Sequence, residues 1–438
     1  MSDSTSIAAL LEARLRALGV ARVYGSALGG LDHIEVEDPD IAVLLADADG
    51  RIGHWDGSGR LGAALLDGPI LHLSSCPGGV APLQTITSVD ELFDALSDPP
   101  GMVLPGTLAL HLDLDLDQMV SPELASREPV RRPVMTLDPS MASLNIIVVV
   151  GPGVVRSGSV EGLQALARTS GFGVLNTWGA KGVERWDSPF HFGTVGLQER
   201  DMELAGLTSA DVLVLSGVDP DETPLDSFGN LLIQEVPPTH LGALTSGWTP
   251  SRDLPTRPPL YDAISSVVTP MYESESVPLT GPRAALHLSG ALPDRGIVVA
   301  DPGAAGFWIA RTLPTSFPGS VCVPATFIAG FAAAAAFVCA IEKRPCLAVS
   351  DQIDGPDGID ETSAAVLELA EAMGLPVALQ LWGPGGQLEK STSHVEMLAS
   401  ALETRTVRID EVPVDVEDVE ALEAVAGQLI AWPPPSDA

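Results

Sequence analysis

The stretch from residue 143 to residue 219 constrains the fold more than any other part of the chain. It places an apolar run, 145–150, before Gly151-Pro152-Gly153, and after a helix-like segment it ends in a second apolar run, 211–215, before Ser216-Gly217. Short apolar runs that end in glycine and alternate with helical segments are typical of buried parallel strands. This stretch therefore predicts an α/β unit with a parallel sheet.

The same alternation continues on both sides of this stretch. On the N-terminal side it predicts helices at 7–18 and 88–96 and strands at 22–24, 41–45, 70–74 and 107–112. On the C-terminal side it predicts strands at 296–300, 345–350 and 377–381 and helices at 304–313, 326–341 and 363–373. The expected fold class is α/β, with three Rossmann-like or flavodoxin-like parallel-sheet domains.

Segments rich in proline and polar residues mark the expected domain boundaries. The expected divisions are a first domain at 1–118, a linker at 119–140, a central domain at 141–260, a linker at 261–285, a third domain at 286–432 and a tail at 433–438.

The net charge of the chain limits the kinds of partner that it is expected to bind. The formal net charge is -35, and the chain holds three lysines, Lys181, Lys343 and Lys390. Nucleic acids and anionic membranes are bound by clustered lysine and arginine. Neither is therefore an expected partner.

Cysteine usage and the N-terminal sequence favour a cytoplasmic location. Cys76, Cys322, Cys339 and Cys346 include no CxxC pair, and the N-terminus lacks a basic segment before an apolar one. The apolar segment 326–341 is shorter than the roughly 20 residues that cross a bilayer. It is expected to form a buried helix, not a transmembrane span.

The motifs at 143–219, together with Lys181-Gly182 and the sequence FHFGTVG at 190–196, resemble the central domain of thiamine diphosphate enzymes of the acetolactate synthase type. The flanks, with ILHLSSCPGG at 70–79 and GIVVADPGAAGF at 296–307, resemble a shortened pyrimidine-binding domain and a diphosphate-binding domain. The resemblance implies the order pyrimidine-binding-like, central, diphosphate-binding-like. It implies thiamine diphosphate and Mg²⁺ as cofactors, with FAD or ADP as further candidates in the central domain. It also implies a homodimer or homotetramer, and it allows a hetero-oligomer with an intact paralogue.

In that family a glutamate of the first domain hydrogen-bonds the cofactor's aminopyrimidine and promotes formation of the thiazolium ylid. Its place falls here at Ala48, between Asp47 and Asp49. Two interpretations stay open: Asp47 or Asp49 is a catalytic acid in a shifted register, or the sequence ADADGR forms a polar turn. Gly25 and Gly78 match glycines that border the cofactor.

In the third domain the resemblance assigns Mg²⁺ binding to Asp351, directly after a strand. Gly383-Pro384 stand where the family has an Asn pair. Asp354, in the loop DGPDG at 354–358, is a second metal candidate, and a solvated turn is the alternative for that loop. Gly303 and Gly330 are the backbone positions expected to approach the diphosphate.

The central domain contributes Lys181 and His191 as candidate contacts to an anionic ligand, with structural roles at strand ends as the alternative. The sequence as a whole favours a degenerate thiamine diphosphate-enzyme-like protein that acts as a structural or regulatory subunit or binds a small molecule. The alternatives are an active thiamine diphosphate- and Mg²⁺-dependent lyase or carboligase acting on a 2-oxo acid, and a nucleotide or acyl-CoA sensor that uses the central domain.

Overall fold

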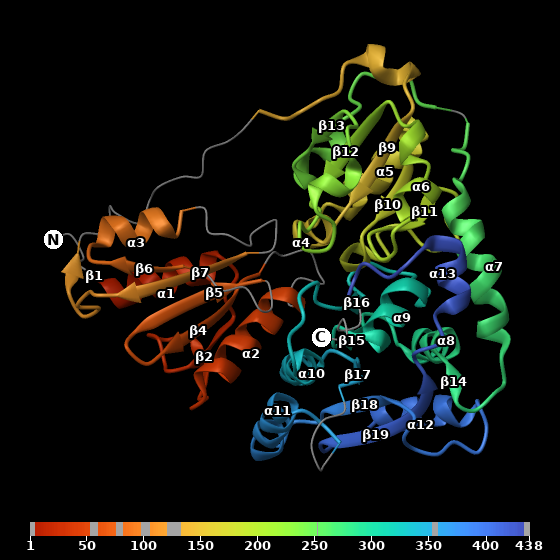
Figure 1. The fold of residues 1–438 in the computed structure, drawn as a ribbon. Helices are drawn as coiled ribbons and strands as arrows, with labels where there is room; N and C mark the ends of the chain where they lie inside the picture. The colour runs from red at the N-terminus through yellow and green to blue at the C-terminus, as the bar shows by residue number, and fades with distance from the viewer. Residues whose placement is uncertain are drawn as a thin grey trace, which may run out of the picture. The chain divides into compact units, whose positions relative to one another are not determined.

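The computed structural model describes residues 5–52, 60–75, 82–97, 106–120, 133–251, 253–352 and 358–432. The chain forms two compact units, Met1–Pro133 and Val134–Ala438. The elements of each unit can be followed in Figure 1.

The first unit contains a six-stranded sheet in the order β3-β2-β4-β5-β7-β6. The α/β class is confirmed, although β5 runs antiparallel to both of its neighbours, so this sheet is mixed. A separate two-stranded ribbon pairs β1 (Thr5–Ser6) with β8 (Met119–Val120). The strands are β2 (Arg22–Gly25), β3 (Asp32–Ile34), β4 (Gly62–Leu66), β5 (Ile70–Ser74), β6 (Leu83–Ile86) and β7 (Thr107–Leu112), and the helices are α1 (Ile7–Ala17), α2 (Pro39–Ile52) and α3 (Val89–Ala95).

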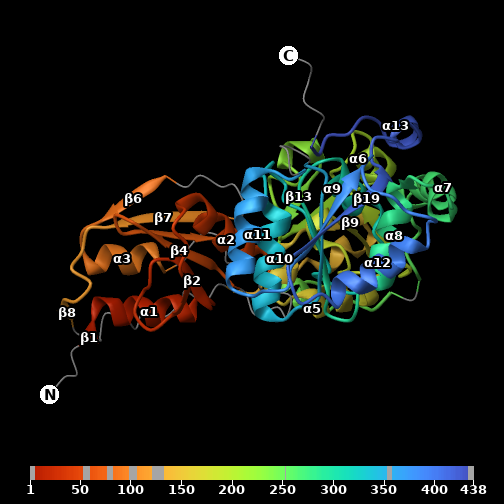
Figure 2. The same ribbon diagram turned by 90° about the horizontal axis from the view of Figure 1, so that it is seen from below.

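Helices α1 and α3 cover one face of this sheet and α2 covers the other (Figure 2). The amphipathic spacing of α1 buries Ile7, Leu11 and Leu15 against the strands. Helix α3 begins with a capping box, in which Ser88 and Glu91 each accept a hydrogen bond from the other's backbone N–H. These local signals explain why both helices were predicted from the sequence.

The strand predicted at 41–45 is wrong, because those residues lie inside helix α2. Every residue from Leu44 to Ile52 is buried, so this segment lacks the apolar stripe on one face that marks an amphipathic helix in the sequence. The helix lies directly against strand backbone: a Cβ on Gly62 would stand 1.6 Å from the Ala46 carbonyl oxygen, and one on Gly50 would stand 2.0 Å from the Ser74 carbonyl oxygen. Glycine at these two positions is what permits the close approach.

The second unit begins with a five-stranded parallel sheet in the order β11-β10-β9-β12-β13. Its strands are β9 (Ile146–Val150), β10 (Gly173–Asn176), β11 (His191–Thr194), β12 (Val212–Ser216) and β13 (Ile233–Glu235), its helices are α4 (Gly153–Arg156), α5 (Val160–Ser170) and α6 (Asp201–Leu204), and its short 3₁₀ helices are η2 (Pro139–Ser143), η3 (Trp178–Ala180), η4 (Leu207–Ser209), η5 (Leu225–Phe228) and η6 (Pro238–Ala243).

Strand β9 is apolar throughout because both faces of the sheet are covered. Ile146, Val148 and Val150 pack in the core that contains α5, while Ile147 and Val149 pack in the core on the opposite face. The unbroken apolar run in the sequence therefore has a direct structural cause.

The second unit continues with a six-stranded parallel sheet in the order β14-β19-β18-β17-β15-β16. Helices α8, α9 and α12 cover one face, and α10 and α11 cover the other (Figure 2). The strands are β14 (Leu279–Thr280), β15 (Ile297–Ala300), β16 (Val321–Cys322), β17 (Cys346–Ser350), β18 (Ala378–Gly383) and β19 (Arg408–Asp415), and the helices are α7 (Pro259–Glu273), α8 (Gly281–Ala291), α9 (Ala304–Thr312), α10 (Phe331–Glu342), α11 (Glu361–Ala372), α12 (Ser393–Leu402) and α13 (Glu420–Ala426).

The alanine-rich segment forms helix α10, which is buried from Phe331 to Cys339. Within the described ranges, no helix combines the length and the apolar character that crossing a membrane requires. The range 261–285, expected as a linker, contains most of α7, all of β14 and the start of α8. Trp178 and Leu197 of the central domain share one hydrophobic core with residues of α8 and α9.

Candidate functional site

Asp47 and Asp49, the candidate catalytic acids, lie in helix α2 and are each 1% exposed. Asp47 is 2.8 Å from Nε2 of His72. Asp49 forms ion pairs with Arg60 at 2.6 Å and Arg22 at 3.3 Å. The polar turn considered for ADADGR is wrong, because buried ion pairs hold these carboxylates inside a helix.

The groups around Asp49 determine how readily its carboxylate takes up a proton. It also accepts a hydrogen bond from the Tyr24 hydroxyl at 3.1 Å, and burial raises the pKa of that hydroxyl well above its usual value. A carboxylate between two guanidinium groups is strongly stabilised as the anion, so it is a poor base for taking up a proton. Ala48, between the two aspartates, is fully buried.

The other predicted residues of the first unit are placed as follows. Gly25 ends strand β2 with a φ of 94°, and a Cβ there would stand 2.5 Å from the Leu65 carbonyl oxygen. Its role in the structure is a close approach between strands. Gly78 lies outside the described residues, as does Asp354 of the third domain.

In the third domain, the order of strands reverses between β15 and β17, which is where open α/β sheets bind ligands. Two carboxylates follow these strands directly. Asp351 accepts a hydrogen bond from the Ala305 N–H at 2.8 Å, in the first turn of α9. Asp301 accepts one from the Ala332 N–H at 2.8 Å, in the first turn of α10. The chain's own carboxylates therefore satisfy backbone donors at two helix N-termini that are suited to anions.

Burial perturbs both carboxyl groups. Burial is the main cause that raises the pKa of Asp301 to about 7. It is also the main cause that raises the pKa of Asp351. The fold thus holds Asp301 where its charged form is disfavoured near neutral pH. Asp301 was missed at the sequence level, although its position directly after the run 296–300 is a usable signal for a residue at the ligand-binding edge.

Gly303 lies beside Asp351, and Gly330 lies against Thr362. A Cβ on Gly303 would lie 2.6 Å from Oδ1 of Asp351, and Gly330 precedes α10 with a left-handed φ of 77°. In the part of the chain that the structure describes, no group of three or more His, Cys, Asp or Glu side chains is arranged to hold a metal ion.

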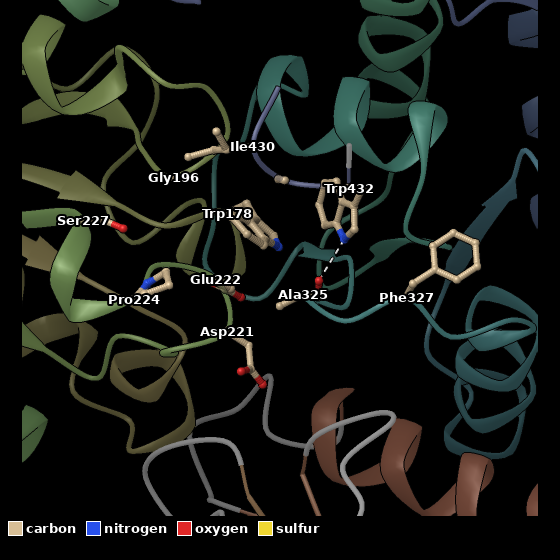
Figure 3. Close-up of a pocket in the computed structure, with 11 residues that line it drawn as sticks. Trp178, Gly196, Asp221, Glu222, Pro224, Ser227, Ala325, Phe327, Ile430 and Trp432 are labelled. Carbon is tan, nitrogen blue, oxygen red and sulfur yellow. Dashed lines mark hydrogen bonds between the residues drawn. The ribbon is translucent and has the colours of Figure 1, made fainter. Parts of the chain in front are cut away.

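A cavity of about 860 Å³ lies at the carboxyl ends of the central strands (Figure 3). Trp178 and Trp432 form one wall, with ring centroids 5.0 Å apart, and Trp432 donates its indole N–H to the Ala325 carbonyl at 3.0 Å. Asp221 and Glu222 also line the cavity. Of the lining residues that the structure describes, none is Lys or Arg.

A second cavity, of about 610 Å³, brings together the two central candidates, Lys181 and His191. We call it the Lys181 cavity. Burial is the main cause that lowers the pKa of Lys181, to about 7, and of His191, to about 3. Arg311, which the sequence did not single out, lines the same cavity and forms a buried ion pair with Asp201 at 2.6 Å.

The comparisons with known proteins agree with the resemblance seen in the sequence. Residues 141–238 match the family model described as thiamine pyrophosphate enzyme, central domain. The fold is similar to an X-ray structure described as a candidate thiamin diphosphate-dependent enzyme isolated from Mycobacterium smegmatis, with a TM-score of 0.60, 14% identity, and coverage of 94% of this chain and 100% of that chain. No curated protein matches this chain in sequence.

Proposed function

We propose that this chain, which carries a thiamine pyrophosphate enzyme central domain on the fold of such enzymes, is a small-molecule-binding protein that does not use thiamine diphosphate in catalysis. The observation that carries the proposal is the pair of hydrogen bonds from Ala305 N–H to Asp351 and from Ala332 N–H to Asp301. A diphosphate at this edge of the sheet would have to displace both carboxyl groups from these N–H donors.

The pyrimidine side supports the same proposal. Activation of the cofactor needs a carboxylic acid that exchanges a proton with the aminopyrimidine. Ala48 cannot do so, and Asp49 is already held by Arg60 and Arg22. In the part of the chain that the structure describes, Ala48 and Asp49 on this side and the two carboxyl groups on the diphosphate side therefore argue against a catalytic thiamine diphosphate site.

The nucleotide-sensor alternative has weaker support. Gly151 lies against Gly217, since a Cβ on Gly151 would stand 2.4 Å from the Gly217 carbonyl oxygen, and this contact closes the crevice between β9 and β12. Helix α4, which follows, is four residues long and presents little helix dipole. The cavity beside it is acidic.

Thermal and urea unfolding with thiamine diphosphate and Mg²⁺ test the proposal. A ligand at about 100 times its dissociation constant adds roughly 2.7 kcal/mol to the free energy of unfolding. Because we propose that thiamine diphosphate does not bind in this way, millimolar cofactor is expected to leave the unfolding curve unchanged. The double variant Asp301→Asn, Asp351→Asn keeps the hydrogen-bond acceptors and removes the charge, and it is expected to gain affinity for the diphosphate. Stabilisation of the wild-type protein by cofactor, together with release of CO₂ from a 2-oxo acid, would instead establish the active lyase or carboligase.

We also propose that the chain assembles as a homodimer or homotetramer, which rests on its resemblance to the family. Light scattering on the purified protein measures this directly. A stable monomer at micromolar concentration would contradict self-association, and co-purification with an intact paralogue would identify a hetero-oligomer.

A further inference from the structure

The Lys181 cavity is built by elements of both domains of the second unit. Lys181 and His191 come from the central domain, Leu260 and Tyr272 from helix α7, and Arg311 from helix α9. Its volume of about 610 Å³ is in the range of pockets that enclose a small organic ligand.

Lys181 is the unusual group in this cavity. Its side chain is 8% exposed, and in the described structure it forms no hydrogen bond and no ion pair. Burying an ammonium group without a partner is costly, and proteins normally pair such a charge or neutralise it. The chain has a net charge of -35, yet no carboxylate among the residues that the structure describes forms an ion pair with this lysine.

The described groups around Lys181 provide no negative charge to pair with its ammonium. Arg311 is already paired with Asp201, and it also donates a hydrogen bond to the Thr194 carbonyl at 3.0 Å. The side chain of Arg257 lies over the Tyr261 ring, 4.3 Å from its centroid. His191 is neutral, because burial and the neighbouring charges of Lys181 and Arg257 lower its pKa to about 3. The polar end of the cavity therefore has room for one negative charge.

The remaining wall is mostly apolar. Leu260, Ile264, Val268 and Leu313 line it. Tyr272 also lines it, and its hydroxyl donates to the Thr312 carbonyl, which leaves the tyrosine ring to face the ligand space. A ligand that fits this wall has an apolar body and a single polar end.

We propose that the Lys181 cavity binds a small monocarboxylate with an aliphatic or aromatic body, its carboxylate against the Lys181 ammonium and its body along Leu260 and Ile264. A monocarboxylate matches the unpaired ammonium of Lys181, whereas a dianionic phosphate would bring a second charge that the described lining of the cavity does not balance. This proposal and the proposed lack of thiamine diphosphate catalysis can fail independently. Titration with thiamine diphosphate tests the proposed function, and titration with carboxylates tests the Lys181 cavity.

Titration calorimetry with octanoate and 4-phenylbutanoate tests the site, with octanamide as the uncharged probe. Both acids are expected to bind wild-type protein and the control variant Lys390→Met, whose lysine is exposed. Lys181→Met is expected to weaken binding by more than about tenfold, the loss of one charge-assisted contact. Octanamide is expected to bind Lys181→Met at least as well as wild type. Equal affinity of octanoate for wild type and Lys181→Met, or no binding to wild type at about 10 mM, would overturn the proposal.

Proton uptake gives a second readout that does not depend on the variant. The titratable and charged groups at the cavity are Lys181, His191, Arg311, Tyr261 and Tyr272, with Arg257 and Asp201 beside them. Since the pKa of Lys181 is about 7, a bound carboxylate is expected to draw a proton onto the amine at about pH 8. Calorimetry in phosphate and in Tris buffer measures this uptake. Binding with no buffer dependence would overturn the pairing with Lys181.

Discussion

Arg311 and Asp201 form an ion pair with Nη2 and Oδ1 2.6 Å apart, and their side chains are 2% and 0% exposed. Arg311 belongs to α9 and Asp201 to α6, so the pair joins the third domain to the central domain. Asp201 also accepts hydrogen bonds from the N–H groups of Leu197 at 2.9 Å and Gln198 at 3.0 Å. The pair therefore fixes the chain that follows β11, at one wall of the Lys181 cavity.

Replacing Arg311 with methionine is expected to lower the free energy of unfolding by about 3–5 kcal/mol, because Asp201 would remain buried as an uncompensated charge. Arg185→Met is the matched control: its partner is Asp187, and both side chains are about half exposed. That control is expected to change stability by less than about 1 kcal/mol. Urea unfolding of both variants measures the difference, and similar losses in the two would contradict a structural role for the buried pair.

Lys181→Met is expected to stabilise the protein, and more at about pH 6 than at about pH 10. In the folded protein, burial and then the charge of Arg311 lower the pKa of Lys181 from 10.5 to about 7. Between these values the unfolded chain binds a proton that the folded chain does not, so wild-type stability rises with pH across this window. Below it, the buried ammonium destabilises the fold by on the order of 4–5 kcal/mol.

Urea unfolding of wild type, Lys181→Met and Lys390→Met at the two pH values checks this expectation. Other groups that titrate near pH 10 are common to the three proteins and cancel in the comparison. A Lys181→Met variant that is less stable than wild type by the same amount at both pH values would show that the lysine acts through packing of its methylene groups.

Gly62→Ala is expected to disrupt the first unit, since its Cβ would stand 1.6 Å from the Ala46 carbonyl oxygen and 2.9 Å from the Gly50 nitrogen. Both contacts are backbone atoms of α2, which cannot rotate away as a side chain could, so the helix has to move off the sheet. Gly68→Ala is the control, because nothing lies within 4 Å of a Cβ there and the loss comes from its φ of 100° alone, on the order of 1 kcal/mol. Hydrogen exchange of amides in α2 measures the effect. Protection that is retained in Gly62→Ala would contradict the close packing.

The sequence predicted secondary structure best where the local signals agreed. The strand at 70–74, the strand at 107–112 and the helix preceded by Ser88 all appear as expected, since burial pattern and capping coincide. Helix α2 was mispredicted because its side chains are buried on nearly every face, so length and periodicity gave no contrast. Its close contacts at Gly50 and Gly62 join segments that are distant in the sequence, so no local sequence pattern predicts them.

The candidate site divides in the same way. Lys181 and His191 were singled out in the sequence as candidate contacts to an anionic ligand, and the structure places both at one cavity. Tyr272 and Arg311 lie 91 and 130 residues after Lys181, and no spacing in the sequence relates them to it. Only the packing of α7 and α9 against the central domain assembles the cavity.

The Trp178–Trp432 contact gives the protein an internal optical probe. The two indoles meet at 62° with centroids 5.0 Å apart, close enough for their electronic transitions to couple and to add a signal to the near-ultraviolet circular dichroism. They form the wall shown in Figure 3, and Trp432 is held by the Pro324 and Ala325 carbonyls. Near-ultraviolet circular dichroism can therefore detect, without any label, a compound that binds at this wall or a change in the position of Trp432.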